Sequence, residues 1–293
     1  MTHPSISVLG ALRALVVGVA VAFGTGAAFA QDAAALKARH AALGAQLADN
    51  IFKRPLVLES VEASGELKGD VYAVIERPFA AVAQSLASAD QWCEVLILHL
   101  NVKGCRASKA NPPVMSVSLG RKFDQALEEA YKADFVYKTA ANEADYLNVQ
   151  MTAASGPLGT RNYRIGLEAV PLDAQRSFIH MGYAYGYGTA ARLAMNAYLG
   201  TVGSDKVGFS TTGRGADGKP AYVGGVRGVV ERNTMRYFLA IETYLASPAQ
   251  NQVDKRLADW FDATERHPQQ LHEMERAEYL EMKKKEVRRQ RDG

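Results

Sequence analysis

The chain has 293 residues, of which 48% are hydrophobic and 22% are charged, and its formal net charge at pH 7 is +3. A chain of this length buries a large core, and a charge so close to balance argues against a nucleic-acid partner or a strongly anionic one. Beyond the first thirty residues, no segment is apolar for long enough to cross a bilayer as a helix.

Residues 1–30 have the pattern of a cleaved secretory signal. Arg13 precedes an apolar run over residues 14–23, and the small residues at 28–30 fit an A-x-A cleavage site. The run is too short to span a membrane, and no cysteine follows the cleavage point, which argues against a lipid anchor. We therefore expect a mature protein that begins at Gln31, with a charge of +2 (the +3 less Arg13). A bacterial periplasm is the first expectation, and secretion is the alternative.

The only two cysteines are Cys93 and Cys105. An isolated pair in an oxidising compartment is most simply a disulfide, which would stabilise the fold by roughly 3 kcal/mol. The spacing is not that of a CxxC redox motif. His99 lies between the two cysteines, but no fourth metal ligand is evident.

The first half of the mature chain divides into helix, strands and helices. Residues 31–55 are expected to form an N-terminal helix that ends at Pro55, because leucines recur along one side of an alanine-rich segment. From Leu56 to Arg77 the alternation is typical of β-strands. Pro78 then opens a helix, with an interruption expected around Ser88.

A run of strand candidates with short links follows, which favours an antiparallel sheet over alternating βαβ units. They are Val114–Leu119, Ala133–Thr139, Tyr146–Thr152, Tyr163–Val170 and Ser177–Tyr187. A short helix at Ala190–Leu199, a strand at Lys206–Thr212 and a glycine-rich turn at Gly213–Lys219 are expected next. That turn contains a literal GxGxxG pattern, but no helix follows it directly, so a dinucleotide site is not expected there.

The strongest helical pattern is at Gly225–Leu245, where apolar residues recur three and four positions apart. Two interpretations remain open. The helix is a core element with a solvated charged face, or it is the wall of a ligand cavity in which Arg232 or Arg236 meets an anionic group. Beyond Pro248, residues 248–293 are expected to form polar helices.

Two segments, residues 71–96 and 227–245, resemble the START-like (SRPBCC) superfamily. The first segment resembles the strand and Pro-led helix near the start of that superfamily's fold, and the second resembles its closing helix. The resemblance covers about residues 56–247. It implies an α+β helix-grip fold, in which a curved antiparallel sheet wraps around a long C-terminal helix, here with added N- and C-terminal helices. Members bind lipids, sterols, polyketides or hormones, and some are enzymes; the fold does not choose among these.

The strand at Phe178–Tyr187 places its tyrosines on one face and His180 on the other. The tyrosines suit a cavity wall, although tyrosine ladders are also ordinary sheet surface. The candidate ligand-binding residues are Tyr163, His180, Tyr183, Tyr185, Arg232, Arg236 and Phe238.

The predicted function is an exported soluble protein that binds a hydrophobic or amphipathic small molecule, with an envelope lipid as one candidate, between the sheet and the long helix. One alternative is an enzyme of the same fold that uses a cavity histidine such as His180 as base. Another is an envelope structural or interaction protein that uses its terminal helices. The basic tail at 283–291 is either a peripheral contact with anionic lipid or a solvated helix end. No catalytic set, metal site or cofactor is expected, and the oligomeric state is not indicated.

Overall fold

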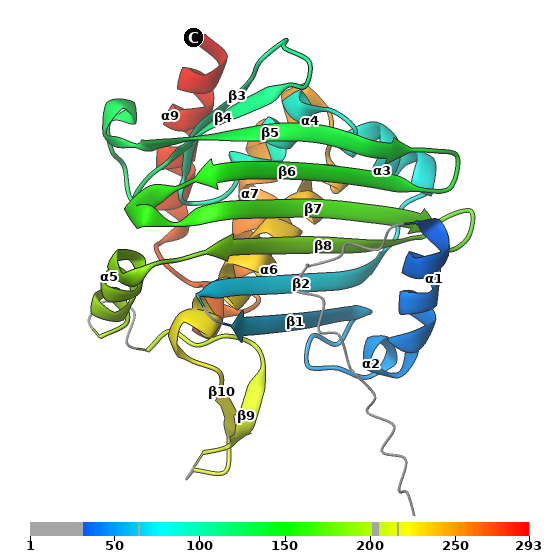
Figure 1. Ribbon diagram of the computed structural model, residues 1–293, viewed down its shortest axis with the longest axis horizontal. Helices are drawn as coiled ribbons and strands as arrows, with labels where there is room; N and C mark the ends of the chain where they lie inside the picture. Colours follow the sequence, from blue (N-terminus) through cyan, green and yellow to red (C-terminus); the bar gives the residue numbers. More distant parts are fainter. Residues whose placement is uncertain (1–31, 64, 201–204, 216, 293) are drawn as a thin grey trace, which may run out of the picture.

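The structure is a computed structural model, and it describes residues 32–63, 65–200, 205–215 and 217–292. The predicted signal at 1–30 lies outside the described residues. The fold is built on an eight-stranded antiparallel sheet in the order β1-β2-β8-β7-β6-β5-β4-β3 (Figure 1). Its strands are β1 Leu56–Ala63, β2 Glu66–Ile75, β3 Val102–Ala107, β4 Val114–Leu119, β5 Tyr131–Asn142, β6 Leu147–Ser155, β7 Arg161–Pro171 and β8 Ser177–Gly186.

Helices cover both faces of this sheet. The longest, α6, packs against β1, β2 and β8, and α1 packs against β7 and β8 on the opposite face (Figure 1). The predicted α+β helix-grip arrangement is confirmed. The helices are α1 Ala33–Ala42, α2 Gly44–Ala48, α3 Phe79–Leu86, α4 Ala89–Leu96, α5 Thr189–Leu199, α6 Gly225–Ala246, α7 Val253–Thr264, α8 Pro268–Leu271 and α9 Arg276–Asp292. Within the described ranges, no helix has the length and hydropathy needed to span a bilayer.

Several boundaries differ from the expectations. The single N-terminal helix is divided into α1 and α2, and the strand expected at Lys206–Thr212 is wrong over most of its length. Instead, β9 (Thr211–Arg214) and β10 (Pro220–Tyr222) form a separate hairpin that projects from the body (Figure 1). The edge strand β3 was not predicted, because a glycine and two basic residues interrupt its short apolar pattern.

Helix α6 is buried on nearly every side, so of the two interpretations left open by the sequence, the core element with a solvated charged face is wrong. Glu231 is fully buried, and Arg232 and Arg236 are each 2% exposed. The Glu231 carboxylate accepts hydrogen bonds from the backbone N–H groups of Phe209 and Ser210, at 2.6 and 2.9 Å. Segments that follow the sheet therefore cover the polar side of α6, and the buried charges of the helix are paired within the protein.

The C-terminal helices share the core with the sheet and α6. On α9, Tyr279, Met282 and Val287 are buried in the main hydrophobic cluster. Lys283 and Glu286 on the same helix are also fully buried. Part of the predicted basic tail is therefore committed to internal contacts, and the apolar side of α9 is not free for a partner.

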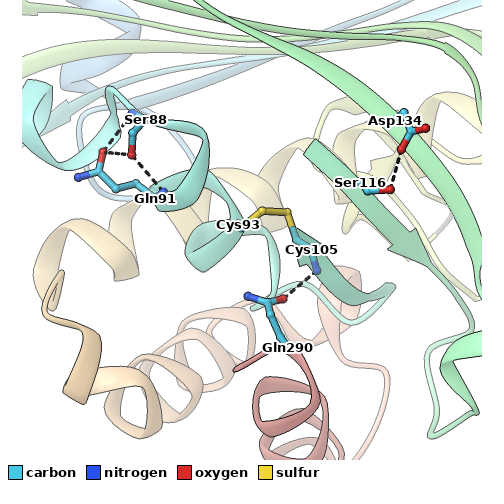
Figure 2. The surroundings of a disulfide bond; sticks show 7 residues. All are labelled: Ser88, Gln91, Cys93, Cys105, Ser116, Asp134 and Gln290. Atoms are coloured by element: carbon cyan, nitrogen blue, oxygen red, sulfur yellow. Dashed lines mark hydrogen bonds between the residues drawn. A yellow bond between two sulfur atoms is a disulfide. The ribbon is translucent and has the colours of Figure 1, made fainter. Parts of the chain in front are cut away.

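The predicted disulfide between Cys93 on α4 and Cys105 on β3 is present (Figure 2). Ser88 caps the start of α4, accepting from the Gln91 N–H at 3.3 Å, which explains the break between α3 and α4. The Gln290 side chain on α9 accepts from the Cys105 N–H at 2.8 Å (Figure 2). The disulfide therefore joins α4 to the sheet edge beneath the end of α9.

Replacing Cys93 and Cys105 together by alanine is expected to lower the free energy of unfolding by about 3 kcal/mol, because the bond closes a short loop that is otherwise free in the unfolded chain. Urea unfolding of the mature protein measures the effect. Reduction of the wild-type protein with dithiothreitol should reproduce most of the loss, whereas the double variant should not respond. Equal stability of oxidised wild type and double variant would contradict this expectation.

Candidate functional site

A cavity of about 510 Å³ lies between the sheet and α6. Side chains from β4, β5, β6, β7 and β8 form one wall, and Asn233 and Tyr237 on α6 form the other. The turn that contains His99 closes one part of the cavity. Residues of the segment 120–131, of the 3-10 turn Pro157–Gly159 and of α5 surround its outer part, and Arg121, Tyr131 and Leu158 among them are exposed.

Four tyrosine rings form a continuous aromatic surface along this cavity. Tyr163 stacks on Tyr185 with ring centroids 5.2 Å apart, and Tyr183 lies 5.4 Å from Tyr185 and 5.3 Å from Tyr237. The alternation of β8 puts Tyr183 and Tyr185 on the same face, toward α6. The surface therefore runs from the sheet to the helix without a break.

Three of the four tyrosine hydroxyls have no partner among the described residues. The Tyr163 hydroxyl donates to Thr160 Oγ1 at 2.8 Å, but no such bond is formed by Tyr183, Tyr185 or Tyr237. Burial raises the pKa of each of these three phenols above the ordinary value of 10.0. They are therefore neutral groups that can donate to, and accept from, a bound molecule.

His99 lies in the cavity wall and is only 2% exposed. Its ring stacks on Tyr237, with centroids 4.6 Å apart, and its Nδ1 accepts from the Asn101 N–H at 3.1 Å. Its Nε2 is buried and has no hydrogen-bond partner within the described part of the chain. The unpaired Nε2 is therefore not exposed in the cavity, and the phenols are the tyrosine groups that offer hydrogen bonds there.

Of the seven residues predicted to bind a ligand, Tyr163, Tyr183 and Tyr185 line the cavity. The other four, which are His180, Arg232, Arg236 and Phe238, do not line it, so the expectation that they face the cavity is wrong. Phe238 is fully buried in the core, where the Arg54 guanidinium lies 5.7 Å from its ring centroid. It follows Tyr237 directly on α6, so helical rotation turns it away from the cavity.

The two arginines of α6 also lie outside the cavity wall. Arg236 forms an ion pair with Glu273 at 2.6 Å and donates to the Leu271 carbonyl at 3.1 Å. Arg232 donates to the Val207 carbonyl at 3.3 Å. Both guanidinium groups therefore tie α6 to the segments that cover its outer side, and neither is placed to meet an anionic ligand in the cavity.

His180 lies on the opposite face of the sheet, beneath α1. Its Nε2 is 2.8 Å from Asp70 and its Nδ1 is 3.0 Å from Glu168, and the Tyr72 ring stacks on it at 4.4 Å. Burial alone would lower the pKa of His180, but the hydrogen bonds and charges of the two carboxylates outweigh it and raise the pKa above 6.5. His180 is a buried cation, and its position rules it out as a base for a molecule in the cavity.

Sequence reasoning missed His99, Asn233 and Tyr237 as wall residues. Tyr237 belongs to the apolar pattern of its helix, but periodicity does not say which of the two adjacent aromatic residues, Tyr237 or Phe238, faces a cavity. No local sequence pattern marks His99 as a residue of the cavity wall. Across the described ranges, no group of three or more His, Cys, Asp or Glu residues is placed to hold a metal ion.

No family model matches the chain, and no curated protein matches it. Similar solved structures include Zhui aromatase/cyclase from Streptomyces sp. R1128, at 12% identity over 67% of this chain and 96% of that one, with a TM-score of 0.34. Norcoclaurine synthase from Thalictrum flavum is similar at 12% identity over 51% of this chain and 82% of that one, with a TM-score of 0.32. A conserved protein from Geobacillus kaustophilus is similar at 11% identity over 61% of this chain and 95% of that one, with a TM-score of 0.34. At these values the likeness carries no argument about activity or ligand. The helix-grip assignment stands on the strand order of the sheet and on the position of α6 against it.

Proposed function

We propose that this chain is an exported protein that binds a hydrophobic or amphipathic small molecule between the sheet and α6. The observation that carries the proposal is the cavity of about 510 Å³ with its aromatic wall. Ligand sites typically occupy about 300–1,000 Å³ and combine an apolar lining with a few polar groups.

The lining indicates the character of the bound molecule. Val117, Phe135, Met151 and Ile165 contribute apolar surface from four successive strands of the sheet. The unpaired tyrosine hydroxyls and the Asn233 side chain add hydrogen-bonding groups. A molecule with an apolar body and a small number of polar atoms matches this combination, and an envelope lipid is one candidate of that class.

Export rests on separate observations. The pattern of residues 1–30 fits a cleaved signal, and the disulfide between Cys93 and Cys105 suits an oxidising compartment. We propose a periplasmic or secreted mature chain that begins at Gln31. Peripheral membrane contact through the tail at 283–291 stays a prediction. Lys283 is fully buried, so only the exposed basic residues of this tail could contact lipid headgroups.

Native mass spectrometry of the mature protein, purified without detergent, tests the proposed function. We expect a population whose mass exceeds that of the chain by one small molecule, which dissociates at higher collision energy. The hydrophobic fluorophore N-phenyl-1-naphthylamine should also bind with saturable enhancement at one site. A protein that carries no added mass and does not bind the fluorophore would contradict the proposal.

Filling the cavity is expected to block that binding. Ala191 on α5 lines the cavity and is 2% exposed. Ala191→Trp should weaken fluorophore binding by about tenfold or more, because the indole takes the space of the ligand. Ala190→Trp is the matched control, since Ala190 is the exposed neighbour on the same helix. Equal affinities of the two variants would contradict the assignment of the binding site.

A further inference from the structure

Four of the seven large hydrophobic side chains that are exposed in the described part of the chain lie at the mouth of the cavity. Leu158 and Leu193 are 66 and 64% exposed, Phe123 is 51% exposed and Tyr131 is 38% exposed. We refer to these four residues as the rim. Single exposed hydrophobic residues are ordinary on a protein surface, but a group of them around the opening of an apolar cavity indicates a surface that binds a partner.

The rim comes from three segments that meet at one end of the sheet (Figure 1). Phe123 lies in the link between β4 and β5, and Tyr131 is the first residue of β5. Leu158 lies in the link between β6 and β7, and Leu193 lies on α5, which follows β8. The antiparallel order of the strands brings these links to the same end, where α5 contacts the turn Pro157–Gly159. All three segments contribute residues to the cavity wall, so the rim side chains are spread around its opening.

The backbone holds two of the rim side chains outward. The buried Lys103 donates from Nζ to the Phe123 carbonyl at 3.0 Å. Leu158 lies in a turn closed by the N–H and the hydroxyl of Thr160, which donate to the Pro157 carbonyl at 3.1 and 2.6 Å. The φ of Leu158 is 56°, in the left-handed region that is unfavourable for leucine. Packing in the core does not explain a leucine that is both exposed and strained in this way.

Basic side chains accompany the rim. Arg121 lines the cavity, Arg161 begins β7 and Arg192 lies on α5, and all three are exposed. None of them forms an ion pair with another described residue. The exposed acidic residues Glu128 and Glu129 lie at the same end, so the excess of positive charge is small. Exposed apolar side chains together with a small positive excess suit a surface that inserts among anionic lipid headgroups.

We propose that the rim is a docking surface for a phospholipid bilayer that contains anionic lipid, and that the cavity exchanges its ligand there. The inference rests on the proposed binding function and adds to it the partner with which the ligand is exchanged. With the rim inserted among the headgroups, a hydrophobic molecule passes between the acyl region and the cavity without crossing water. This contact is separate from the one predicted for the basic tail at 283–291, which is electrostatic.

Co-sedimentation of the mature protein with vesicles of phosphatidylcholine and phosphatidylglycerol tests this surface. The rim variant, Phe123→Gln with Leu193→Gln, is expected to weaken vesicle binding by about tenfold or more, because two apolar side chains no longer insert. Neither residue lines the cavity, so the rim variant should bind N-phenyl-1-naphthylamine in solution as tightly as wild type. Retained fluorophore binding also shows that the variant is folded.

Two controls separate the rim from other causes of vesicle binding. Val61→Thr with Val136→Thr is the matched control variant, since these valines are 56 and 42% exposed on β1 and β5 and do not line the cavity. It should bind vesicles as wild type does. The difference between wild type and the rim variant should persist in about 1 M salt, where charges are screened within about 3 Å. A contact made by the basic tail would be lost under that condition.

The outcomes distinguish this inference from the proposed function. Weaker vesicle binding of the rim variant alone, with fluorophore binding retained, supports the docking surface. Equal vesicle binding of wild type and rim variant overturns it, as does a wild type that binds the fluorophore but no vesicles. A wild type that dimerises instead, through a contact that the rim variant loses, assigns the surface to a second copy and also overturns it. Absence of fluorophore binding in wild type overturns the proposed function, and this inference with it.

Discussion

Glu286→Gln is expected to lower the free energy of unfolding by about 3–5 kcal/mol, because it removes the carboxylate that pairs with two fully buried lysines. Glu286 lies 3.0 Å from Lys103 Nζ and 2.5 Å from Lys283 Nζ. Glutamine keeps the shape and removes the charge, so both ammonium groups would remain buried without compensation. Urea unfolding of the mature protein measures the loss.

The pH dependence of this loss has a definite sign. Burial lowers the pKa of Lys283 to about 8, whereas an unfolded lysine titrates near about 10.4. Between these values the unfolded chain binds more protons, so the contribution of Lys283 to stability increases with pH. Loss of the Glu286 charge lowers the pKa of Lys283 further. The Glu286→Gln deficit should therefore be smaller at about pH 9 than at about pH 7.

Glu281→Gln is the matched control for that variant. Glu281 is on the same helix, its side chain is 72% exposed, and it pairs with Lys285 at 3.0 Å. An exposed pair of this kind contributes about 0–1 kcal/mol. Equal stabilities of the Glu281 and Glu286 variants would show that the buried cluster does not hold α9 against β3.

His180→Phe is expected to destabilise the protein by about 3–5 kcal/mol, because it leaves the buried carboxylates of Asp70 and Glu168 without the cation between them. The phenyl ring retains the stacking surface for Tyr72, so the loss reports charge and hydrogen bonding more than packing. Asp70 is 5% exposed and Glu168 is fully buried. The measurement is again urea unfolding, and a loss below about 1 kcal/mol would contradict the account.

The stability that His180 contributes should depend on pH in the opposite direction from that of Lys283. Its folded pKa is raised above 6.5, so its contribution is complete below the unfolded pKa and is lost as pH rises through the folded one. The His180→Phe deficit should therefore shrink at alkaline pH. His40→Phe is the control: His40 is half-exposed on α1 and contacts the Phe178 ring, and its replacement should cost little at any pH.

The order of elements could be predicted because hydrophobic spacing records which side of each segment is buried. The long helix was predicted at Gly225–Leu245 and is observed at Gly225–Ala246. Alternation in β8 correctly separated Tyr183 and Tyr185 from His180. The disulfide was expected from an isolated pair of cysteines in a chain with a predicted export signal.

The polar interior could not be predicted from periodicity. For the charged residues of α6 and α9 the sequence left only solvent or an external ligand or lipid as partners, because a charge in a helix is usually exposed unless it is paired. The partners lie far away in sequence: Glu273 for Arg236, and Lys103 for Glu286. Only the tertiary arrangement brings these charges together, and the unpaired Nε2 of His99 is a property of the same arrangement.

A crystal structure of the mature protein, purified without detergent, tests the central claim most directly. The account predicts electron density for one non-protein molecule between the sheet and α6. That density should contact the aromatic surface of Tyr183, Tyr185 and Tyr237. A cavity closed by the protein's own side chains, or one that holds only water after soaking with N-phenyl-1-naphthylamine, would contradict it.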